Sequence, residues 1–546
     1  MSEALGVGGV GVDDDFFLMG GDSIVSMRFA DMARHAGLAL RPRDVAEGRT
    51  VAALAAIAER SAPRRGPAGE GRHRDGGGAG EGVGELPATP IIRRMWDVEG
   101  PIDAYHLSMA VRVPADARAE HLTAALQALV DRHDALRMRQ QDDQGRRALE
   151  IEEPGSARVA DCFTHQVIQV ADEAEWPPAL AEASFRHQAQ LDPGSGRTLQ
   201  AIWLDPGPER PGRLLILLHH LVVDGVSWRF LLPDLARAYE AVAAGRRPDL
   251  RAPATSYRRW ARHLVEEAVE PAREKELEMW TRMFEPKRPT LGTRRPDPRT
   301  DTLASARMVL LDLPEEDTAT LLAVPGALGV DLRDVLYASF AVAYARWRGD
   351  EGTGVLVDLQ AHGREFLADG VDPSSTVGWF TAQFPFVLDP GEISEEQLDA
   401  SGAALTEGAA RVGAQLAALP DNGIGYGLLR YLNPRTAPQL AALGDPQVSV
   451  NYLGRFQVGE SSAHWTPTGE AGSAMGGGAD AGAPLERTLT LTVAVEDRER
   501  GARLAARWIW PSGVLEDDHV AGLARRWFDV LRRYAGHTRA VRTQAP

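Results

Sequence analysis

The most informative stretch of this 546-residue chain reads His219-His220-Leu221-Val222-Val223-Asp224-Gly225-Val226-Ser227-Trp228. It follows an apolar run, 214–218, that predicts a buried strand, and it precedes an amphipathic run, 230–243, that predicts a helix. Two adjacent imidazoles at the end of a strand suit proton transfer, because the ordinary pKa of histidine lies closest to neutral pH. A short motif of this kind also occurs where a histidine pair is merely buried and hydrogen-bonded, so the rest of the chain has to decide between the two interpretations.

Composition and charge exclude several classes of protein. Hydrophobic residues make up 44% of the chain and charged residues 25%, as in ordinary globular proteins. The net charge of −17 argues against a nucleic-acid partner, which would need a basic face. No apolar run approaches the roughly 20 residues that span a bilayer, and the acidic, glycine-rich N-terminus shows no secretory signal. We therefore expect no membrane contact and a cytoplasmic location.

The chain is long enough for several packing units, because single cores seldom grow beyond about 250–300 residues. Residues 1–60 predict a small helical unit, with helical apolar spacing over 24–36 and again over 50–58. Residues 61–85 are rich in Gly, Pro, Arg and Glu, and we expect a flexible linker there. The single cysteine, Cys162, excludes an internal disulfide and a cysteine-rich zinc site, and no metal site is indicated.

Residues 86–540 predict one long α/β region. Apolar or alternating runs predict strands at 106–113, 214–218, 354–359, 448–452 and 488–495, whereas periodic runs predict helices at 119–131, 332–346 and 517–534. A stretch rich in Pro and Arg, 286–299, is expected to cross between two lobes. The N-lobe would then cover about 86–285 and the C-lobe about 300–540.

A second motif lies near the N-terminus, where the sequence reads Phe16-Phe17-Leu18-Met19-Gly20-Gly21-Asp22-Ser23-Ile24. Taken alone, it predicts a tight turn followed by a serine that caps a helix. With the acidic run 13–15 before it and Thr50-Val51-Ala52-Ala53-Leu54 after it, residues 1–60 resemble a peptidyl carrier domain of nonribosomal peptide synthetases. The resemblance implies an all-α four-helix bundle whose first helix is truncated, 1–5 being only its tail.

The resemblance to a carrier also implies a cofactor and partners. Ser23 would hold 4′-phosphopantetheine, attached by a phosphopantetheinyl transferase, and the thiol of that group would carry an aminoacyl or peptidyl thioester. An aspartate directly before the serine, here Asp22, is typical of carriers that serve epimerization domains. An upstream adenylation domain and a downstream condensation domain are the further partners that such a carrier implies.

Further motifs are spread over the region from Leu86 onward. They read Leu86-Pro87-Ala88-Thr89-Pro90, Arg132-His133-Asp134-Ala135-Leu136-Arg137, Ala361-His362-Gly363-Arg364-Glu365, Thr376-Val377-Gly378-Trp379-Phe380-Thr381, Gly423-Ile424-Gly425-Tyr426-Gly427 and Val450-Asn451-Tyr452-Leu453-Gly454. In this order, together with His219 to Trp228, they resemble an epimerization domain of the condensation superfamily. The implied fold is a two-lobed α/β domain like chloramphenicol acetyltransferase, with a channel between the lobes and His220 near its midpoint.

The resemblance assigns roles to the site residues. His220 would be an acid/base that takes the α-proton of the thioester, while Asp224 would be a structural anchor paired with Arg364. Tyr452 stands where the family places a polar residue that lines the reaction chamber. Backbone N–H groups at the start of the helix near Val226 could stabilise the enolate. The histidines at 133 and 362 are expected to pack or to form hydrogen bonds rather than to catalyse.

One position departs from the family, which carries a glutamate as second acid/base two residues before the histidine of His-Gly-Arg-Glu. Here that residue is Gln360, whose amide has no proton to exchange near neutral pH. Three interpretations remain open. Asp358, on the same strand face, could point into the chamber. His220 could act slowly as a single base with a water or Tyr452. Alternatively, the domain could bind the carrier without inverting anything.

The leading hypothesis is therefore a carrier–epimerization didomain that interconverts L- and D-aminoacyl or peptidyl thioesters. The first alternative is amide-bond formation by a condensation domain, which shares the histidine motif but not the Gly-Trp-Phe-Thr pattern at 378–381. The second is a non-catalytic module that holds a loaded carrier. The sequence does not name the amino acid, because adenylation elsewhere would select it.

Overall fold

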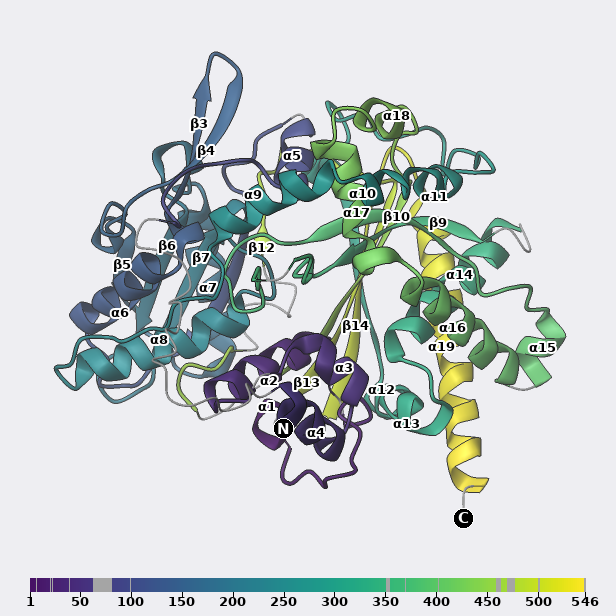
Figure 1. Ribbon diagram of the computed structural model, residues 1–546, viewed down its shortest axis with the longest axis horizontal. Helices are drawn as coiled ribbons and strands as arrows, with labels where there is room; N and C mark the ends of the chain where they lie inside the picture. Colours follow the sequence, from purple (N-terminus) through teal and green to yellow (C-terminus); the bar gives the residue numbers. More distant parts are fainter. Residues whose placement is uncertain are drawn as a thin grey trace.

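The computed structural model describes residues 1–5, 7–19, 21, 23–38, 40–61, 81–98, 100–349, 354–368, 370–400, 402–457, 463–468, 477–498 and 501–544. They form a small helical unit and a larger α/β domain of two lobes (Figure 1). No described helix is both long and apolar enough to cross a membrane. Most of the expected linker, 62–80, lies outside the described residues, and strand β1 begins at Gly84, two residues before the boundary expected from the sequence.

The helical unit consists of α1 (Ser2–Leu5), α2 (Ser23–His35), α3 (Pro42–Gly48) and α4 (Val51–Ser61). Its small core includes Phe16, Ala30, Val45 and Leu54. The turn before α2 closes on Phe16, since Gly21 donates its N–H to the Phe16 carbonyl at 2.9 Å. A Cβ at Gly21 would lie 2.3 Å from the Phe16 ring. Glycine is therefore required where the chain turns into the helix that Ser23 opens.

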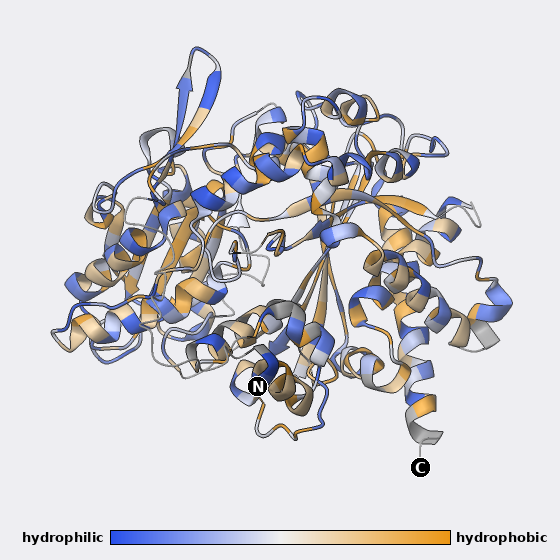
Figure 2. Ribbon diagram, in the orientation of Figure 1, coloured by the Kyte–Doolittle hydropathy of each residue, from blue (hydrophilic) through white to orange (hydrophobic). Residues whose placement is uncertain are grey.

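The N-lobe is built around a five-stranded sheet of order β12-β2-β7-β6-β5 and a three-stranded sheet of order β1-β4-β3. Its strands are β1 (Gly84–Leu86), β2 (His106–Arg112), β3 (Met138–Asp143), β4 (Arg146–Ile151), β5 (Phe163–Val167), β6 (Leu199–Asp205) and β7 (Arg213–His219). Its helices are α5 (Pro90–Asp97), α6 (Ala119–Arg132), α7 (Trp176–Gln188), α8 (Trp228–Ala243) and α9 (Tyr257–Ala268). Figure 2 shows that the β3–β4 hairpin, which projects from this lobe, is hydrophilic toward its tip.

Strand β7 explains the apolar run that precedes the two histidines. Leu214, Ile216 and Leu218 pack in the main N-lobe core under α6 and α8, whereas Leu215 and Leu217 pack in a smaller core under α7. A strand that is covered on both faces needs apolar side chains at every position, not at alternate ones. The continuous apolar run therefore explains why β7 lies at the centre of the sheet. His219 and His220 lie at the end of this strand.

The C-lobe is built around a six-stranded sheet of order β10-β9-β11-β13-β14-β8. Its strands are β8 (Ala306–Leu313), β9 (Val355–Ala361), β10 (Ala382–Leu388), β11 (Val448–Gln457), β13 (Leu489–Arg498) and β14 (Gly501–Pro511), and the short β12 (Gly477–Gly478) joins the N-lobe sheet instead. Its helices are α10 (Pro271–Glu274), α11 (Leu277–Arg282), α12 (Glu315–Leu322), α13 (Val324–Leu328), α14 (Leu332–Arg348), α15 (Glu395–Ala400), α16 (Ala403–Ala417), α17 (Ile424–Gly427), α18 (Ala437–Ala441) and α19 (Asp517–Gln544).

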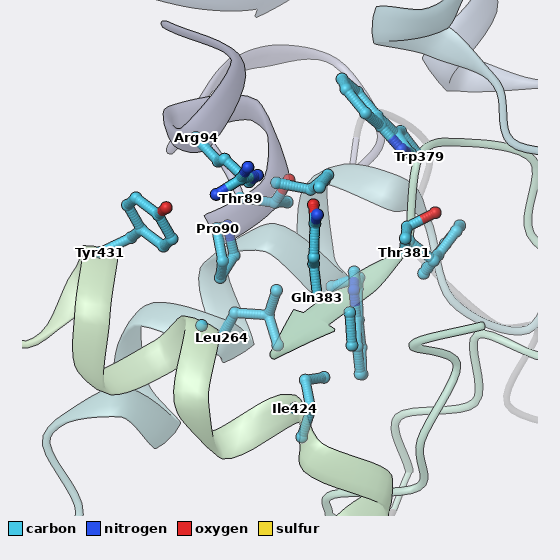
Figure 3. A pocket seen from close by; sticks show the side chains of 14 residues that line it. Thr89, Pro90, Arg94, Leu264, Trp379, Thr381, Gln383, Ile424 and Tyr431 are labelled. Carbon is cyan, nitrogen blue, oxygen red and sulfur yellow. The ribbon is translucent and has the colours of Figure 1, made fainter. Parts of the chain in front are cut away.

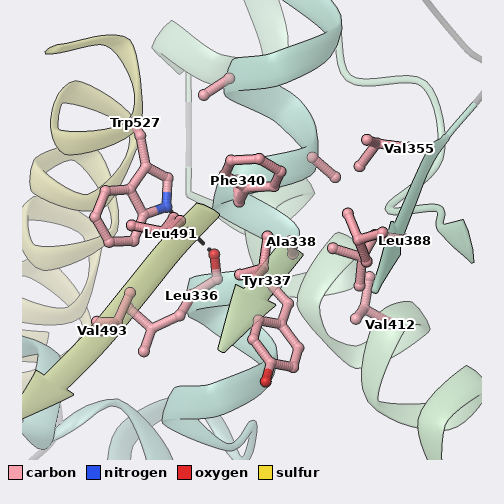
Figure 4. Close-up of a cluster of buried hydrophobic side chains, with 14 of the residues drawn as sticks. Leu336, Tyr337, Ala338, Phe340, Val355, Leu388, Val412, Leu491, Val493 and Trp527 are labelled. Carbon is pink, nitrogen blue, oxygen red and sulfur yellow. Dashed lines mark hydrogen bonds between the residues drawn. The ribbon is translucent and has the colours of Figure 1, made fainter. Parts of the chain in front are cut away.

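The two faces of the C-lobe sheet differ in chemistry. Alternate residues of β9, β10, β11 and β13 form one apolar face that packs under α14 and α19, as Figure 4 shows for Leu491, Val493, Phe340 and Trp527. The Trp527 indole donates a hydrogen bond to the Leu336 carbonyl at 3.3 Å. Because successive strand residues point to opposite faces, the polar residues between them lie on the other face, which includes Asp358, Gln360, Gln383, Ser449 and Asn451.

The chain crosses between the lobes earlier than the sequence indicated. Trp260 and Ala268 of α9 belong to the N-lobe core, and Trp280 of α11 already belongs to the C-lobe core. Within the stretch 286–299, Leu291 is also part of the C-lobe core, and its N–H donates to Gln447 at 2.8 Å. The expectation that 286–299 crosses is therefore wrong. The crossing runs through α10, a four-residue helix with a single proline at its start, and lies before the longer stretch rich in Pro and Arg.

Candidate functional site

The first histidine of the pair, His219, is fully buried at the end of β7. Its Nδ1 accepts a hydrogen bond from the Leu221 N–H at 3.0 Å, so Nε2 carries the proton and donates to the Ile102 carbonyl at 2.8 Å. Burial lowers the pKa of His219 to about 4. Both ring nitrogens are thus engaged with the backbone, and His219 fixes the strand end rather than facing a reactant.

The second histidine, His220, opens the one-turn helix η5 (His220–Val222) and contacts two aromatic rings, which also contact each other with centroids 5.9 Å apart. The Tyr105 ring stacks on it with centroids 4.7 Å apart, and the Trp379 ring lies at 4.3 Å on another side. Nδ1 of His220 is buried without a hydrogen-bond partner among the described residues. Burial lowers the pKa of His220 to about 4, and the Asp224 carboxylate offsets this only in part. The imidazole is therefore neutral at pH 7 and able to accept a proton.

Asp224 and Arg364 form a buried ion pair that joins the two lobes. Arg364 Nη1 and Nη2 lie 2.6 and 3.0 Å from the two carboxylate oxygens of Asp224, and the guanidinium lies 4.2 Å from the centre of the Phe380 ring. The carboxylate also accepts hydrogen bonds from the Ser227 N–H and hydroxyl, at 2.9 and 2.8 Å, and from the Phe380 N–H at 3.2 Å. Asp224 is paired with Arg364 as expected. Its carboxylate oxygens accept hydrogen bonds from neighbouring residues and therefore have a structural role.

The segment 376–380 holds Trp379 against His220. The Tyr257 hydroxyl donates to the Trp379 carbonyl at 2.8 Å, and the Gly378 N–H donates to the Ser227 hydroxyl at 3.2 Å. Gly378 has a φ of 155°, and a Cβ there would lie 2.3 Å from the Tyr257 ring. The glycine of Gly-Trp-Phe-Thr thus allows the backbone to approach the tyrosine closely, which sets the position of the indole.

Gln360 lies on the polar face of the C-lobe sheet, where its side-chain oxygen accepts a hydrogen bond from Asn451 Nδ2 at 2.8 Å. Asp358, two residues earlier, is buried and bound to Arg487, with Nε and Nη2 at 2.9 and 2.6 Å from one carboxylate oxygen. Gln383 donates to the same oxygen. Asp358 is therefore held in an ion pair with Arg487. The structure does not support the idea that Asp358 replaces the family glutamate as second acid/base.

Tyr452 lies elsewhere than expected. It packs against the C-lobe hydrophobic core, on the same strand face as Val448 and Val450. Its neighbour Asn451 is on the polar face, in contact with Gln360. The expectation that Tyr452 lines the chamber is therefore corrected: alternation along β11 gives that face to Asn451. The idea that Tyr452 serves as a proton partner for His220 loses its basis as well.

Trp379, which contacts His220, also lines a small cavity (Figure 3). Its accessible volume is about 20 Å³, which is room for one water. Its polar lining residues include Thr89 and Arg94 from the N-lobe and Thr381, Gln383 and Tyr431 from the C-lobe. The sequence did not point to this cavity, because its lining comes from segments up to several hundred residues apart.

Three further titratable side chains lie near these motifs. His133 Nε2 contacts Asp234 at 3.0 Å, and His362 Nδ1 accepts the Arg364 N–H at 3.0 Å, so both take part in hydrogen bonds as expected. Burial raises the pKa of Glu365 to about 7. One oxygen of Glu365 accepts from Asn422 at 3.1 Å, and the other is buried without a hydrogen-bond partner among the described residues.

The carrier unit fits the expected cofactor in one observable respect. Ser23 is the first residue of the 13-residue helix α2, where unpaired backbone N–H groups and the helix dipole favour a phosphate. Among the described residues, no group of three or more His, Cys, Asp or Glu side chains could hold a metal ion.

Comparison with known proteins agrees with this geometry. Residues 83–473 match the family model of the condensation domain, and residues 1–58 match that of the phosphopantetheine attachment site. In Brevibacillus parabrevis, one of the linear gramicidin synthase proteins is 32% identical over 536 residues, which cover 96% of this chain and 10% of that protein. Surfactin synthase subunit 1 of Bacillus subtilis (strain 168) is 32% identical over 471 residues, which cover 83% of this chain and 12% of that protein. The chain thus spans about a tenth of the length of these relatives.

Solved structures confirm the fold. The epimerization domain from the third module of tyrocidine synthetase B superposes with a TM-score of 0.70 at 24% identity and covers 84% of this chain and 98% of that one. The first condensation domain of the calcium-dependent antibiotic synthetase, in complex with a substrate analogue, superposes with a TM-score of 0.58 at 18% identity and covers 83% and 97% of the two chains. The predicted combination of a helical carrier and a two-lobed α/β domain is confirmed.

Proposed function

Because the chain belongs to the condensation-domain family of nonribosomal peptide synthetases and carries a phosphopantetheine attachment domain at its N-terminus, we propose that it epimerizes the α-carbon of a carrier-bound thioester. The observation that carries this proposal is His220, a neutral imidazole in contact with the Tyr105 and Trp379 rings at the end of the central strand. The finer choice of epimerization over amide-bond formation is supported by the Gly-Trp-Phe-Thr segment that holds Trp379.

In the proposed reaction, His220 removes the α-proton of the thioester and holds it on the imidazole. Phosphopantetheine on Ser23 supplies the thioester, whose carbonyl makes that proton more acidic. The Tyr105 and Trp379 rings pack against the imidazole and restrict its rotation, which pre-organises the proton transfer. Asp224 and Arg364 act as positioning residues, since they join η5 to the segment that carries Trp379.

Inversion also needs a proton delivered to the opposite face of the enolate, and this is where Gln360 limits the site. An amide cannot supply that proton, so water has to deliver it, and the hydroxide that remains takes up the proton held on the His220 imidazole. We therefore propose a slow, one-base epimerase. The cavity lined by Trp379, which has room for a single water, supports the presence of a water near this part of the site.

A second candidate function follows from the same residue. Because Gln360 accepts a hydrogen bond from Asn451 and has no acidic proton, the domain could hold a loaded carrier without inverting its cargo. Because the chain belongs to the condensation-domain family, amide-bond formation is an alternative reaction on the same fold.

The test uses the full chain with Ser23 loaded by a phosphopantetheinyl transferase with a panel of L-aminoacyl groups. After incubation, the released amino acid is analysed by chiral chromatography. A rising D fraction is the expected result. A purely L product from folded, fully loaded protein would reject the epimerase proposal, and dipeptide formation with a second loaded carrier would support condensation instead.

A further inference from the structure

The carrier touches the α/β domain through an ion pair at the end of α2. Arg34, in the last turn of that helix, places Nη1 2.7 Å from Asp372 Oδ2, and its Nη2 donates to the Ser374 hydroxyl at 3.0 Å. The side chains of Arg34 and Asp372 are only 27% and 19% exposed. Figure 1 shows the carrier helices, in purple, beside the lower part of the two lobes. One guanidinium thus bridges two acceptors on a single short loop of the C-lobe.

The receiving loop also forms hydrogen bonds within the α/β domain. The Asp372 N–H donates to the Thr255 hydroxyl at 2.8 Å, and the Thr376 hydroxyl donates to the Thr255 carbonyl at 2.6 Å. Asp372 Oδ1 also accepts the Ser374 N–H at 3.0 Å, which turns Oδ2 toward the carrier. Both acceptors of the Arg34 guanidinium are therefore held in place by hydrogen bonds within the α/β domain.

The same loop continues into the candidate site. The Thr376 carbonyl accepts a hydrogen bond from Arg364 Nη2 at 3.2 Å. Three residues later, Trp379 lies against His220. A continuous series of contacts therefore leads from the carrier helix, through residues 372–379, to the imidazole and to the buried ion pair of Arg364.

We propose that Arg34 is the positioning residue by which this chain docks its own carrier for reaction at His220, and that Asp372 and Ser374 are its receptor. This inference rests on the proposed function. A single partly exposed ion pair is weak, but the carrier and the domain share one chain, so the contact forms at high effective concentration. A weak contact also suits a carrier that has to leave for other domains.

The experiment compares one substrate with and without the carrier. The full chain is loaded on Ser23 with an L-phenylalanyl pantetheine group, and α-proton exchange in deuterated water is measured. The same protein is then given free L-phenylalanyl-N-acetylcysteamine, which does not need docking. In Arg34→Asp, tethered exchange should fall roughly five- to tenfold more than exchange of the free thioester, as expected for loss and reversal of one partly exposed ion pair.

Charge reversal makes the test specific. Asp372→Arg should reproduce the selective loss, and the double variant Arg34→Asp/Asp372→Arg should recover most of the tethered rate. Arg60→Asp, the same change at an exposed position of α4, is the matched control and should behave as wild type. An equal loss for both substrates, an unaltered tethered rate in Arg34→Asp, or failure of the double variant to recover would each overturn the proposal.

A second measurement separates docking from catalysis. Hydrogen–deuterium exchange of residues 371–376 in the full chain should be faster in Arg34→Asp than in wild type and should return to the wild-type rate in the double variant. If wild type exchanges no α-proton at all, the proposed function fails, while this result still supports docking. If the exchange rate of the loop is the same in all variants, docking through Arg34 fails whatever the catalytic result.

Discussion

At the scale of single residues, His220 differs from its neighbour in what its ring nitrogens do. His219 has both nitrogens bound to backbone groups, whereas His220 is held by ring contacts and keeps Nδ1 without a partner among the described residues. The sequence identified the pair, but it could not reveal that two aromatic rings pack against His220. Tyr105 and Trp379 lie 274 positions apart, and no local pattern indicates that the two rings meet on one imidazole.

The most direct prediction at this scale concerns Gln360. Replacing it with glutamate should raise the rate of epimerization about 100-fold, at the low end of what a positioned acid/base contributes. Asn451 can donate to a carboxylate as it does to the amide, so the new side chain should keep its place. The rate is measured on the loaded full chain by chiral analysis. Gln360→Met, similar in size but without an acid, is the control, and a similar gain there would contradict the account.

Glu365 gives a prediction on pH. Its pKa is about 7 when folded, against an ordinary value of 4.5, so the folded state binds a proton more tightly than the unfolded one. The proton therefore stabilises the fold fully below pH 4.5, and this stabilisation is lost as the pH rises through 7. Glu365→Gln should add about 2 kcal/mol to the free energy of unfolding at pH 8.5 and almost nothing at pH 4.5.

The measurement for Glu365 is urea unfolding at the two pH values, followed by the near-ultraviolet signal of the tryptophans. Glu392→Gln, at an exposed position of the same lobe, is the matched control and should shift both values equally. A Glu365→Gln variant that is destabilised at pH 8.5 would show that the carboxylate, rather than the neutral acid, is the favoured form in the fold.

At the scale of elements, alternation explains both what the sequence predicted and what it missed. The continuous apolar run of β7 and the alternating runs of β9, β11 and β13 were predicted as strands, and the long helices α6, α14 and α19 were predicted with their starts correct. The strand β14 was not predicted, although apolar residues alternate along it at 502, 504, 506, 508 and 510 and pack on the C-lobe core. The sequence did not show which face of β11 packs on the core. Tyr452 was therefore expected on the polar face, which is occupied by Asn451.

Gly363 tests the element that carries Arg364. Its φ is 67°, and a Cβ there would lie 1.8 Å from the Phe380 carbonyl oxygen. Gly145 has a φ of 84° but faces open space. Gly145→Ala should therefore cost only about 1–2 kcal/mol for the left-handed backbone. Gly363→Ala should cost several kcal/mol more, since a backbone clash has to be relieved.

Thermal unfolding followed by circular dichroism measures the two glycine variants side by side. The midpoint of Gly145→Ala should stay close to that of wild type, while that of Gly363→Ala should drop strongly or the protein should fail to fold. Equal midpoints would mean that the segment 362–364 can move away from Phe380 and that the approach of the two backbones is not required for the fold.

At the scale of the whole molecule, the two lobes contact each other at the candidate functional site. The Asp224–Arg364 ion pair and the cavity beside Trp379 both draw on residues from each lobe. The overall division into carrier and two-lobed domain could be predicted from ordered motifs, because each motif marks a fixed place in the family fold. The crossing point between the lobes and the carrier contact through Arg34 could not, because both depend on side chains that pack over long distances in sequence.

The central claim is that the His220 imidazole accepts the α-proton. The full chain, loaded on Ser23 with an L-aminoacyl group, is incubated in deuterated water, and deuterium at the α-carbon is counted by mass spectrometry in wild type, in His220→Ala and in His165→Ala, a change at a half-exposed surface histidine. The account predicts deuterium uptake in wild type and His165→Ala and only the uncatalysed background in His220→Ala. Undiminished uptake in folded His220→Ala would contradict it.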